Sequence, residues 1–144
     1  MIKKICSLAL LLAFCTPAFA VDKVAIIDVQ KVVNKSAQVQ ALKKEQEAKS
    51  KELKQFIKKA NDEVKAQTDE KKKQEIVKKY EKELAAKREA NSKAYKAKLE
   101  AIDKTITATI NNYAKTNGND LVLVKGAVLY GGDDITEAVS KVVK

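Results

Sequence analysis

The feature that most constrains this chain is a stretch, residues 21 to 117, that contains neither Gly nor Pro. Much of the stretch consists of Lys, Glu, Gln, Ala and Leu, which have high helix propensity. Because Gly and Pro interrupt helices most strongly, their absence predicts helix over nearly all of this length. Gly118 follows as a stop signal, so a different structure is expected after it.

One segment, Ala66–Lys73, is a plausible break in the helical stretch. Thr68 or Asp69 can act as an N-cap there, and Asp69 and Glu70 supply the anionic groups that a first helical turn favours. We therefore expect helices over about 29–66 and 69–115. Together they would form a hairpin arm over residues 31–116 with its tip near 67–70.

Apolar residues follow heptad spacing along both predicted helices, which indicates a coiled coil. On the second helix the pattern runs through Ala94 and then through Ile102, Ile106, Ile110 and Tyr113. Polar residues interrupt the pattern at mid-arm, at Gln46 and Lys49 on one helix and at Lys87 and Asn91 on the other. A polar layer lowers coiled-coil stability locally, so these four residues predict a flexible joint.

Outside the arm, three short apolar runs predict strands. Val24–Ile27 precedes the arm, and Leu121–Val124 and Ala127–Tyr130 follow it. The last two runs flank Lys125-Gly126, the pattern of a β-hairpin in which Gly tolerates the positive φ of the turn. Residues 21–30 and 117–144 are therefore expected to form a β-rich body.

The closing segment, DDITEAVSKVVK, predicts a short amphipathic helix. Asp134 and Glu137 have spacing similar to that of a capping box, and Asp28 can cap the helix that opens the arm. Apolar residues of the segment share one face of the predicted helix: Ile135, Val139, Val142 and Val143.

The predicted strands are apolar at nearly every position, so both faces of their sheet need to be covered. A single chain of this size cannot cover both faces, whereas strands from several copies that close on themselves would do so. We expect a shared core at six positions: Val24, Ile26, Leu121, Leu123, Val128 and Tyr130.

The N-terminus has the pattern of a cleavable signal peptide over residues 1–20. Lys3 and Lys4 form a positive region, an apolar run follows, and Ala18-Phe19-Ala20 is a small-x-small cleavage site. Cleavage would remove both cysteines, so the exported chain would carry no disulfide. The expected destination is a bacterial periplasm.

The positive charge of the chain is concentrated on the predicted arm. Residues 31–115 hold 23 Lys and Arg against 13 Asp and Glu, and all but one of these basic residues are Lys. Seven lysines in three clusters near the tip are candidates for binding a partner: Lys58, Lys59, Lys71, Lys72, Lys73, Lys78 and Lys79. A solvated coiled-coil face is the plainer interpretation of most of the lysines.

Several classes of function are disfavoured. The chain has no His, and both Cys lie in the predicted signal peptide, so no Ser-His or Cys-His arrangement can form. Its glycines form no phosphate-binding loop. We expect no enzyme activity, no cofactor and no metal site. The export signal, the single Arg and the scattered aromatic residues argue against nucleic-acid binding, although the pI is about 9.5.

Both ends of the exported chain resemble the Skp (OmpH) family of periplasmic chaperones. KVAIIDVQKVV is similar to the opening strand and helix of the family, and DLVLVKGAVLYGGDDITEAV is similar to its closing segment. Between them, the helical hairpin matches in length and composition. The resemblance implies an α+β fold: a coiled-coil arm on a small β body that completes a barrel by trimerisation.

The same resemblance implies the function. Such a protein is an ATP-independent holdase that keeps unfolded outer-membrane β-barrel proteins from aggregating, in a cavity between the arms of a homotrimer. Anionic lipid or lipopolysaccharide is a further candidate partner, although the site described for some members has no residue-by-residue match here. The alternative is a coiled-coil envelope spacer or adaptor that binds one defined partner.

Overall fold

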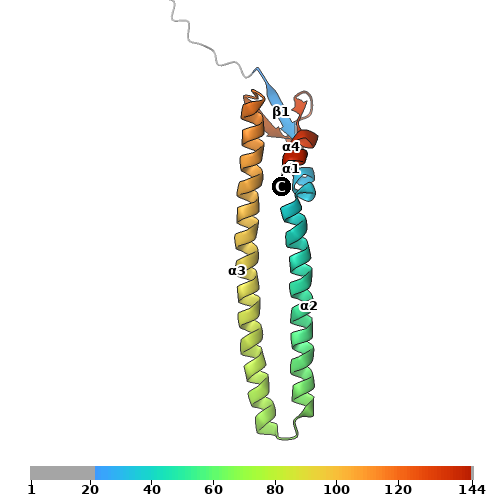
Figure 1. Cartoon of the computed structure of the whole chain (residues 1–144), viewed down its shortest axis with the longest axis vertical. Coiled ribbons are helices and arrows are strands. Elements are labelled where there is room, and N and C mark those ends of the chain that lie inside the picture. The colour runs from blue at the N-terminus through green and yellow to red at the C-terminus, as the bar shows by residue number, and fades with distance from the viewer. Residues whose placement is uncertain (1–21, 144) are drawn as a thin grey trace, which may run out of the picture.

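A computed structural model describes residues 22–143 (Figure 1); the predicted signal peptide, residues 1–20, lies outside them. The fold is α+β and mostly helical, with a long helical hairpin on a small three-stranded body, as the sequence predicts. Its elements in chain order are β1 (Val24–Ile27), α1 (Val29–Lys35), α2 (Ala37–Ala66), α3 (Glu70–Thr116), β2 (Leu121–Val124), the short 3₁₀ turn η1 (Lys125–Ala127), β3 (Asp133–Asp134) and α4 (Thr136–Val142).

The expected first helix is divided into α1 and α2 at Ser36. The side chain of Asp28 caps α1 by accepting the N–H of Lys31 at 3.0 Å. At Ser36 the backbone is extended, and its hydroxyl accepts the N–H of Val39 at 3.4 Å, so Ser36 ends one helix and caps the next. The prediction of a continuous helix was wrong here because Ser competes for backbone hydrogen bonds and favours caps.

The tip of the arm consists of the few residues between Ala66 and Glu70. Asp69 is the N-cap of α3, and its carboxylate accepts the N–H groups of Lys71 at 2.8 Å and Lys72 at 3.3 Å. At its far end, α3 stops just before Gly118, which has a φ of 65°. That left-handed conformation is accessible to Gly at little cost, so the predicted stop signal is confirmed.

The strand arrangement differs from the predicted β-hairpin. The sheet order is β2-β1-β3, and both neighbours run parallel to β1. Parallel strands need a long crossover, and the whole α1–α3 arm provides it between β1 and β2. Lys125-Gly126 lies in the 3₁₀ turn, and β2 pairs with β1 instead of Ala127–Tyr130.

The segment after η1 crosses to the far edge of β1 and forms β3 there. A Cβ placed on Gly132 would lie 2.6 Å from Cγ2 of Ile26, so a side chain at this position would clash. Gly132 also has a φ of 90°, which disfavours other residues. The sequence pattern gives the strand propensity of Ala127–Tyr130 but does not show that β1 offers both of its edges to other segments.

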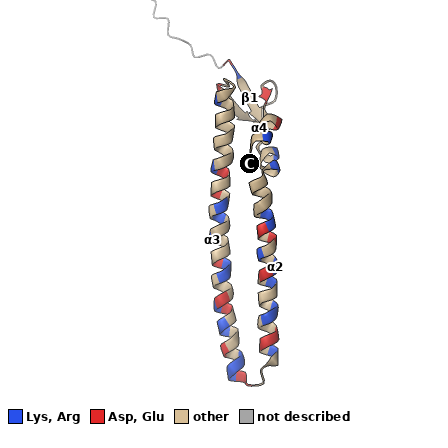
Figure 2. Ribbon diagram, in the orientation of Figure 1, with Lys and Arg blue, Asp and Glu red and all other residues tan. Residues whose placement is uncertain are grey.

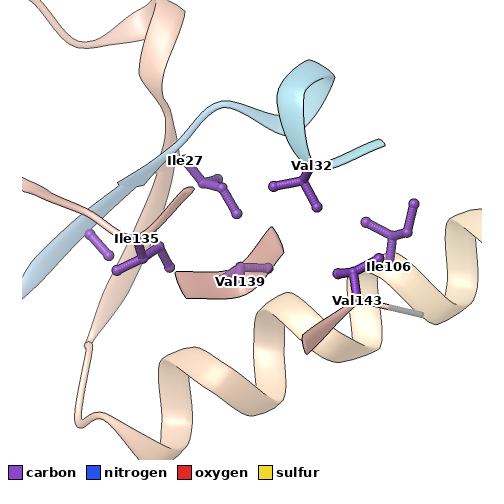
Figure 3. Packing of buried hydrophobic residues seen from close by; sticks show 7 residues of the cluster. Ile27, Val32, Ile106, Ile135, Val139 and Val143 are labelled. Atoms are coloured by element: carbon purple, nitrogen blue, oxygen red, sulfur yellow. The ribbon is translucent and has the colours of Figure 1, made fainter. Parts of the chain in front are cut away.

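The hydrophobic core lies on one face of the sheet (Figure 3). Ala25 and Ile27 alternate with less buried neighbours along β1 and point toward the helices. Helices α1 and α4 and the base of α3 cover this face, and the buried residues that they and the segment flanking α4 contribute are Val32, Ile106, Ile135, Val139 and Val143. The core is small because α1 and α4 each have only seven residues.

Ion pairs fasten α4 to α1. Both Lys31 and Lys35 place Nζ 2.7 Å from the carboxylate of Glu137. Asp134 accepts the backbone N–H of Thr136 at 3.0 Å and pairs with Lys125 at 2.6 Å. The predicted capping-box role was therefore wrong, because Glu137 reaches across to α1 and the N-cap residue of α4 is Ile135, which makes no side-chain cap hydrogen bond.

We call the ion pairs of Glu137 with Lys31 and Lys35 the clasp. The clasp makes the stability of the folded protein depend on pH. Hydrogen bonds from Lys31 and then Lys35 hold the pKa of Glu137 at about 2, below its ordinary value of 4.5. Because the folded-state pKa is the lower one, this stabilisation is present above about pH 4.5 and is lost as the pH falls toward 2. Lys125 likewise holds the pKa of Asp134 well below its usual range, so its stabilisation is lost in the same direction.

We therefore expect Glu137→Gln to flatten part of the fall in melting temperature between about pH 5 and pH 2. Melting should be followed by circular dichroism, with Glu75→Gln, an exposed residue of the arm, as the control. The control should keep the wild-type profile. A Glu137→Gln profile parallel to that of the wild type would show that the clasp does not stabilise the body.

Candidate functional site

The two arm helices contact each other along a seam that is apolar near the tip. Phe56 of α2 and Tyr80 of α3 pack edge to face, with ring centroids 5.2 Å apart and an interplanar angle of 64°. Only 9% of Tyr80 is exposed, and its hydroxyl hydrogen-bonds to Glu63. That bond, together with burial and the charge of Glu63, raises the pKa of Tyr80 to about 12. The aromatic pair thus stabilises the part of the arm farthest from the body.

The residues of the predicted joint, Gln46, Lys49, Lys87 and Asn91, are all half-buried. Lys49 and Lys87 both contact the carboxylate of Glu52, at 2.9 and 3.9 Å. Lys87 also lies over the ring of Phe56, with Nζ 5.2 Å from the centroid. The two lysines therefore lie at the same height, and their side chains reach past the seam toward its edges.

The heptad pattern of α3 shifts between the predicted joint and the body. Ala94, which the predicted pattern placed in the seam, is exposed, and every residue from 92 to 101 is exposed as well. The seam resumes at Ile102, eleven positions after Asn91. An eleven-residue step is a heptad with four residues inserted, which unwinds a coiled coil locally. The continuous heptad prediction for α3 was wrong at this point.

The seven candidate lysines surround the distal arm without forming a single cluster. Lys58 and Lys59 lie on one side of α2 near Glu63, and Lys59 is 3.9 Å from that carboxylate. Lys71 and Lys72 are exposed at the tip, and Lys79 lies 5.9 Å from the ring centre of Tyr80. The remaining two, Lys73 and Lys78, border a hollow between the helices.

Charge is unevenly distributed along the arm (Figure 2). Lysines and acidic residues alternate along the distal and middle parts, whereas the part next to the body is largely uncharged. On α2, the segment from Ala37 to Leu42 carries no charge. Long-range attraction to a partner therefore originates in the distal and middle parts of the arm, and not in the part next to the body.

The outer face of the sheet is apolar, and the described residues cover it only in part. Val24 pairs with Leu121 and Ile26 with Leu123 in the strand register. Successive side chains of a strand point to opposite faces, and Ala25 and Ile27 point to the core, so these four point outward. Leu121 and Leu123 are 41% and 37% exposed. The structure thus brings together four of the six residues predicted for a shared core.

The other two residues predicted for that core lie in the segment between η1 and β3. Val128 is half-buried, whereas Tyr130 is 98% exposed. Leu129 is fully exposed beside it, and the sequence pattern did not single it out. Its place within an apolar run was the available signal. Tyr95 and Leu99 were missed too, although their spacing of four residues on a helix places them on one side.

Residues 22–143 place no three Asp or Glu side chains close enough together to hold a metal ion. Within the same range, no helix combines the length and the apolar character needed to cross a membrane.

The family comparison gives a clear result. A family model described as outer membrane protein (OmpH-like) matches residues 23–143. A comparison with curated proteins gives no significant match. The family match extends from β1 through both long helices to the end of α4. The chain therefore belongs to the OmpH-like outer membrane protein family.

Proposed function

We propose that the protein is an ATP-independent holdase chaperone of the periplasm for unfolded outer-membrane β-barrel proteins. Its clients would be bound in a cavity between the arms of a homotrimer and kept from aggregating before insertion. Membership of the OmpH-like family supports this function. The observation that carries it is that one small body has both an open apolar sheet face and a long basic arm.

Self-association explains the open sheet face. Val24, Ile26, Leu121 and Leu123 expose apolar area that a single chain leaves in contact with water. Within the described residues, β2 also has a free edge, since it pairs with β1 alone. Association between copies would bury the exposed apolar face and pair the free edge of β2. Copies joined through their bodies would hold their arms around a common space.

Arms with this charge distribution can capture a client before close contact. Lysine-rich distal segments attract acidic, unfolded chains over several ångströms, which raises the association rate. Each contact is weak, because these lysines are mostly solvated, but many contacts act together. A client bound in this way stays mobile and can leave without ATP hydrolysis.

Aggregation of a urea-unfolded outer-membrane protein after dilution tests the proposal directly. A holdase should suppress light scattering by several unrelated barrel proteins and form a soluble complex with each. A spacer or adaptor with one defined partner should protect none of them. If the protein suppressed light scattering for none of the clients, the proposed function would be ruled out.

Reversing the charge of arm lysines tests whether electrostatic attraction captures the client. Glu at Lys71, Lys72 and Lys73 should slow client association about tenfold at low salt and weaken its salt dependence. Screening lengths fall from roughly 30 Å at 0.01 M salt to 3 Å at 1 M. The control replaces the same residues by Arg, which keeps the charge. A wild-type rate that is insensitive to salt would contradict electrostatic capture.

Assembly through the sheet face is tested by Leu123→Asp. Because Leu123 is 37% exposed in the single chain, a charge there is tolerated by the protomer but is costly in a shared core. We expect the variant to sediment as a single chain while keeping its helical circular dichroism. The control is Ser92→Asp on the exposed arm. A Leu123→Asp protein that still sediments as a trimer would show that the assembly uses another surface.

We also propose that the arm bends near Gln46, Lys49, Lys87 and Asn91, which would let the cavity admit clients of different sizes. The half-burial of these polar residues and the exposed segment 92–101 above them support a joint. Amide exchange should be faster at 46–49 and 87–91 than at 53–60 and 77–84. Leu at all four positions should slow it, whereas Leu at the exposed Lys51 and Lys93 should not. Equal protection along the wild-type arm would mean that no joint exists.

A further inference from the structure

The arm has two unlike sides. On its helices, the exposed large hydrophobic residues are Ile57, Val77, Tyr95 and Leu99, whose exposed fractions run from 37% to 43%. In α3, Val77 and Tyr95 are 18 positions apart, which is five turns at about 3.6 residues per turn. In α2, Ile57 lies 18 positions after Val39. Both helices therefore repeat apolar residues on one side at the same interval.

Two hollows between the helices open on this side. The distal hollow is lined by Ile57 and Val64 of α2 and by Val77 and Leu84 of α3. The proximal hollow, closer to the body, is lined by Val39, Leu42, Tyr95 and Leu99, with Gln46 at its edge. All four exposed hydrophobic residues of the arm therefore belong to one of these hollows. We call the side that carries both hollows the apolar side.

Polar contacts between the two helices lie on the opposite side. Lys98 forms an ion pair with Glu45, and Lys87 lies 3.9 Å from Glu52. On α2, Glu45 and Glu52 are one heptad apart and lie well away from Ile57 around the helix axis. A third hollow on this opposite side is lined by Glu45 and Lys98 and by Ala41 and Ala101. Ion pairs thus fasten one side of the hairpin and leave the other apolar and open.

The distance between the two hollows matches a particular kind of ligand. Val77 and Tyr95 are about 27 Å apart along the helix at ~1.5 Å per residue. An extended chain spans that distance in about eight residues. Transmembrane β-strands have about 9–11 residues and carry aromatic residues near both membrane interfaces. One such strand, laid along the arm in extended form, places its two aromatic ends near the two hollows.

Charged residues of both signs border the hollows. Lys43 and Glu47 border the proximal hollow, and Glu81 borders the distal one. An adjoining hollow is bordered by Lys73 and Lys78 and by Glu70 and Glu81. Arg88 of α3 lies between the two hollows. It follows Val77 by eleven residues, which is about three helical turns, so it lies on the same side of the helix. The hollows are therefore not selective for the charge of a ligand, and their apolar lining favours a segment with apolar ends.

We infer that the apolar side of each arm is its client-binding side, and that it takes one extended segment of an unfolded barrel strand with aromatic residues in both hollows. This inference rests on the proposed holdase function and deepens it. The two hollows act as linked sites, so occupation of one raises the effective concentration of the ligand at the other. Segments with aromatic residues about eight positions apart are then preferred over segments with closer spacing.

Two synthetic peptides of identical composition test the spacing, with two Tyr either eight or four positions apart. Wild-type protein should bind the widely spaced peptide about tenfold more tightly. Substituting either hollow, by Ile57→Gln with Val77→Gln or by Tyr95→Gln with Leu99→Gln, should remove this preference. The matched control is Ala41→Gln with Ala101→Gln, which changes the hollow on the opposite side and should keep the preference.

Full-length client gives the second readout. All four Gln substitutions together should weaken binding of a urea-unfolded barrel protein about tenfold, with unchanged helical circular dichroism and unchanged mass. Wild-type affinity in that variant, while wild-type protein still suppresses aggregation, overturns this inference but not the holdase function. A change of mass shows that a second copy covers the apolar side, which also overturns it. Wild-type protein that binds neither client nor peptide overturns both.

Discussion

Parallel pairing of β1 with β2 is the interaction on which the rest of the molecule depends. In the chain β1 precedes the arm and β2 follows it, so their hydrogen bonds join the two bases of the helical hairpin. Side chains beside the sheet reinforce the junction: Asp120 accepts the N–H groups of Asp22 and Lys23 at 3.1 and 3.0 Å, and the Lys23 ammonium donates to the carbonyl of Asn117 at 2.7 Å. Without this junction, the bases of α2 and α3 would be held together only through their seam, which is polar at mid-arm and shifts on α3 above it.

The same pairing produces a sheet with two unequal faces. Its inner face is covered by α1, α4 and the base of α3, and the clasp of Glu137 with Lys31 and Lys35 keeps the two short helices together. Its outer face exposes Leu121 and Leu123 to solvent. Stabilisation by one small core is modest, because free energy follows the apolar area removed from water. A body of this kind gains most from association, which is consistent with the proposed division between an assembling body and capturing arms.

The arm shows a similar asymmetry. Ion pairs between α2 and α3 are exposed, and such pairs contribute little to stability individually. They nevertheless set which side of the hairpin is polar, and the apolar hollows are left on the other side. Weak seams and open hollows fit a protein that must bind many unfolded chains without holding any of them rigidly. The phenolic contact of Tyr80 with Glu63 and the packing of Phe56 stabilise the helices in the distal part of the arm.

The sequence by itself determined the long helices, their break near Asp69, the stop at Gly118 and the concentration of lysines on the arm, because propensity, caps and charge are local properties. It also indicated the apolar residues of the body. Only the tertiary structure decided how they are used: β1 pairs with β2 and β3 in place of the predicted hairpin, Ser36 divides the first helix, and Glu137 reaches α1 instead of capping its own helix. The two-sided character of the arm likewise appears only when α2 and α3 are side by side. Residues far apart in the chain determine the strand partners, the ion pairs between elements and the hollows between helices. A local pattern does not specify which of several competing partners a residue contacts.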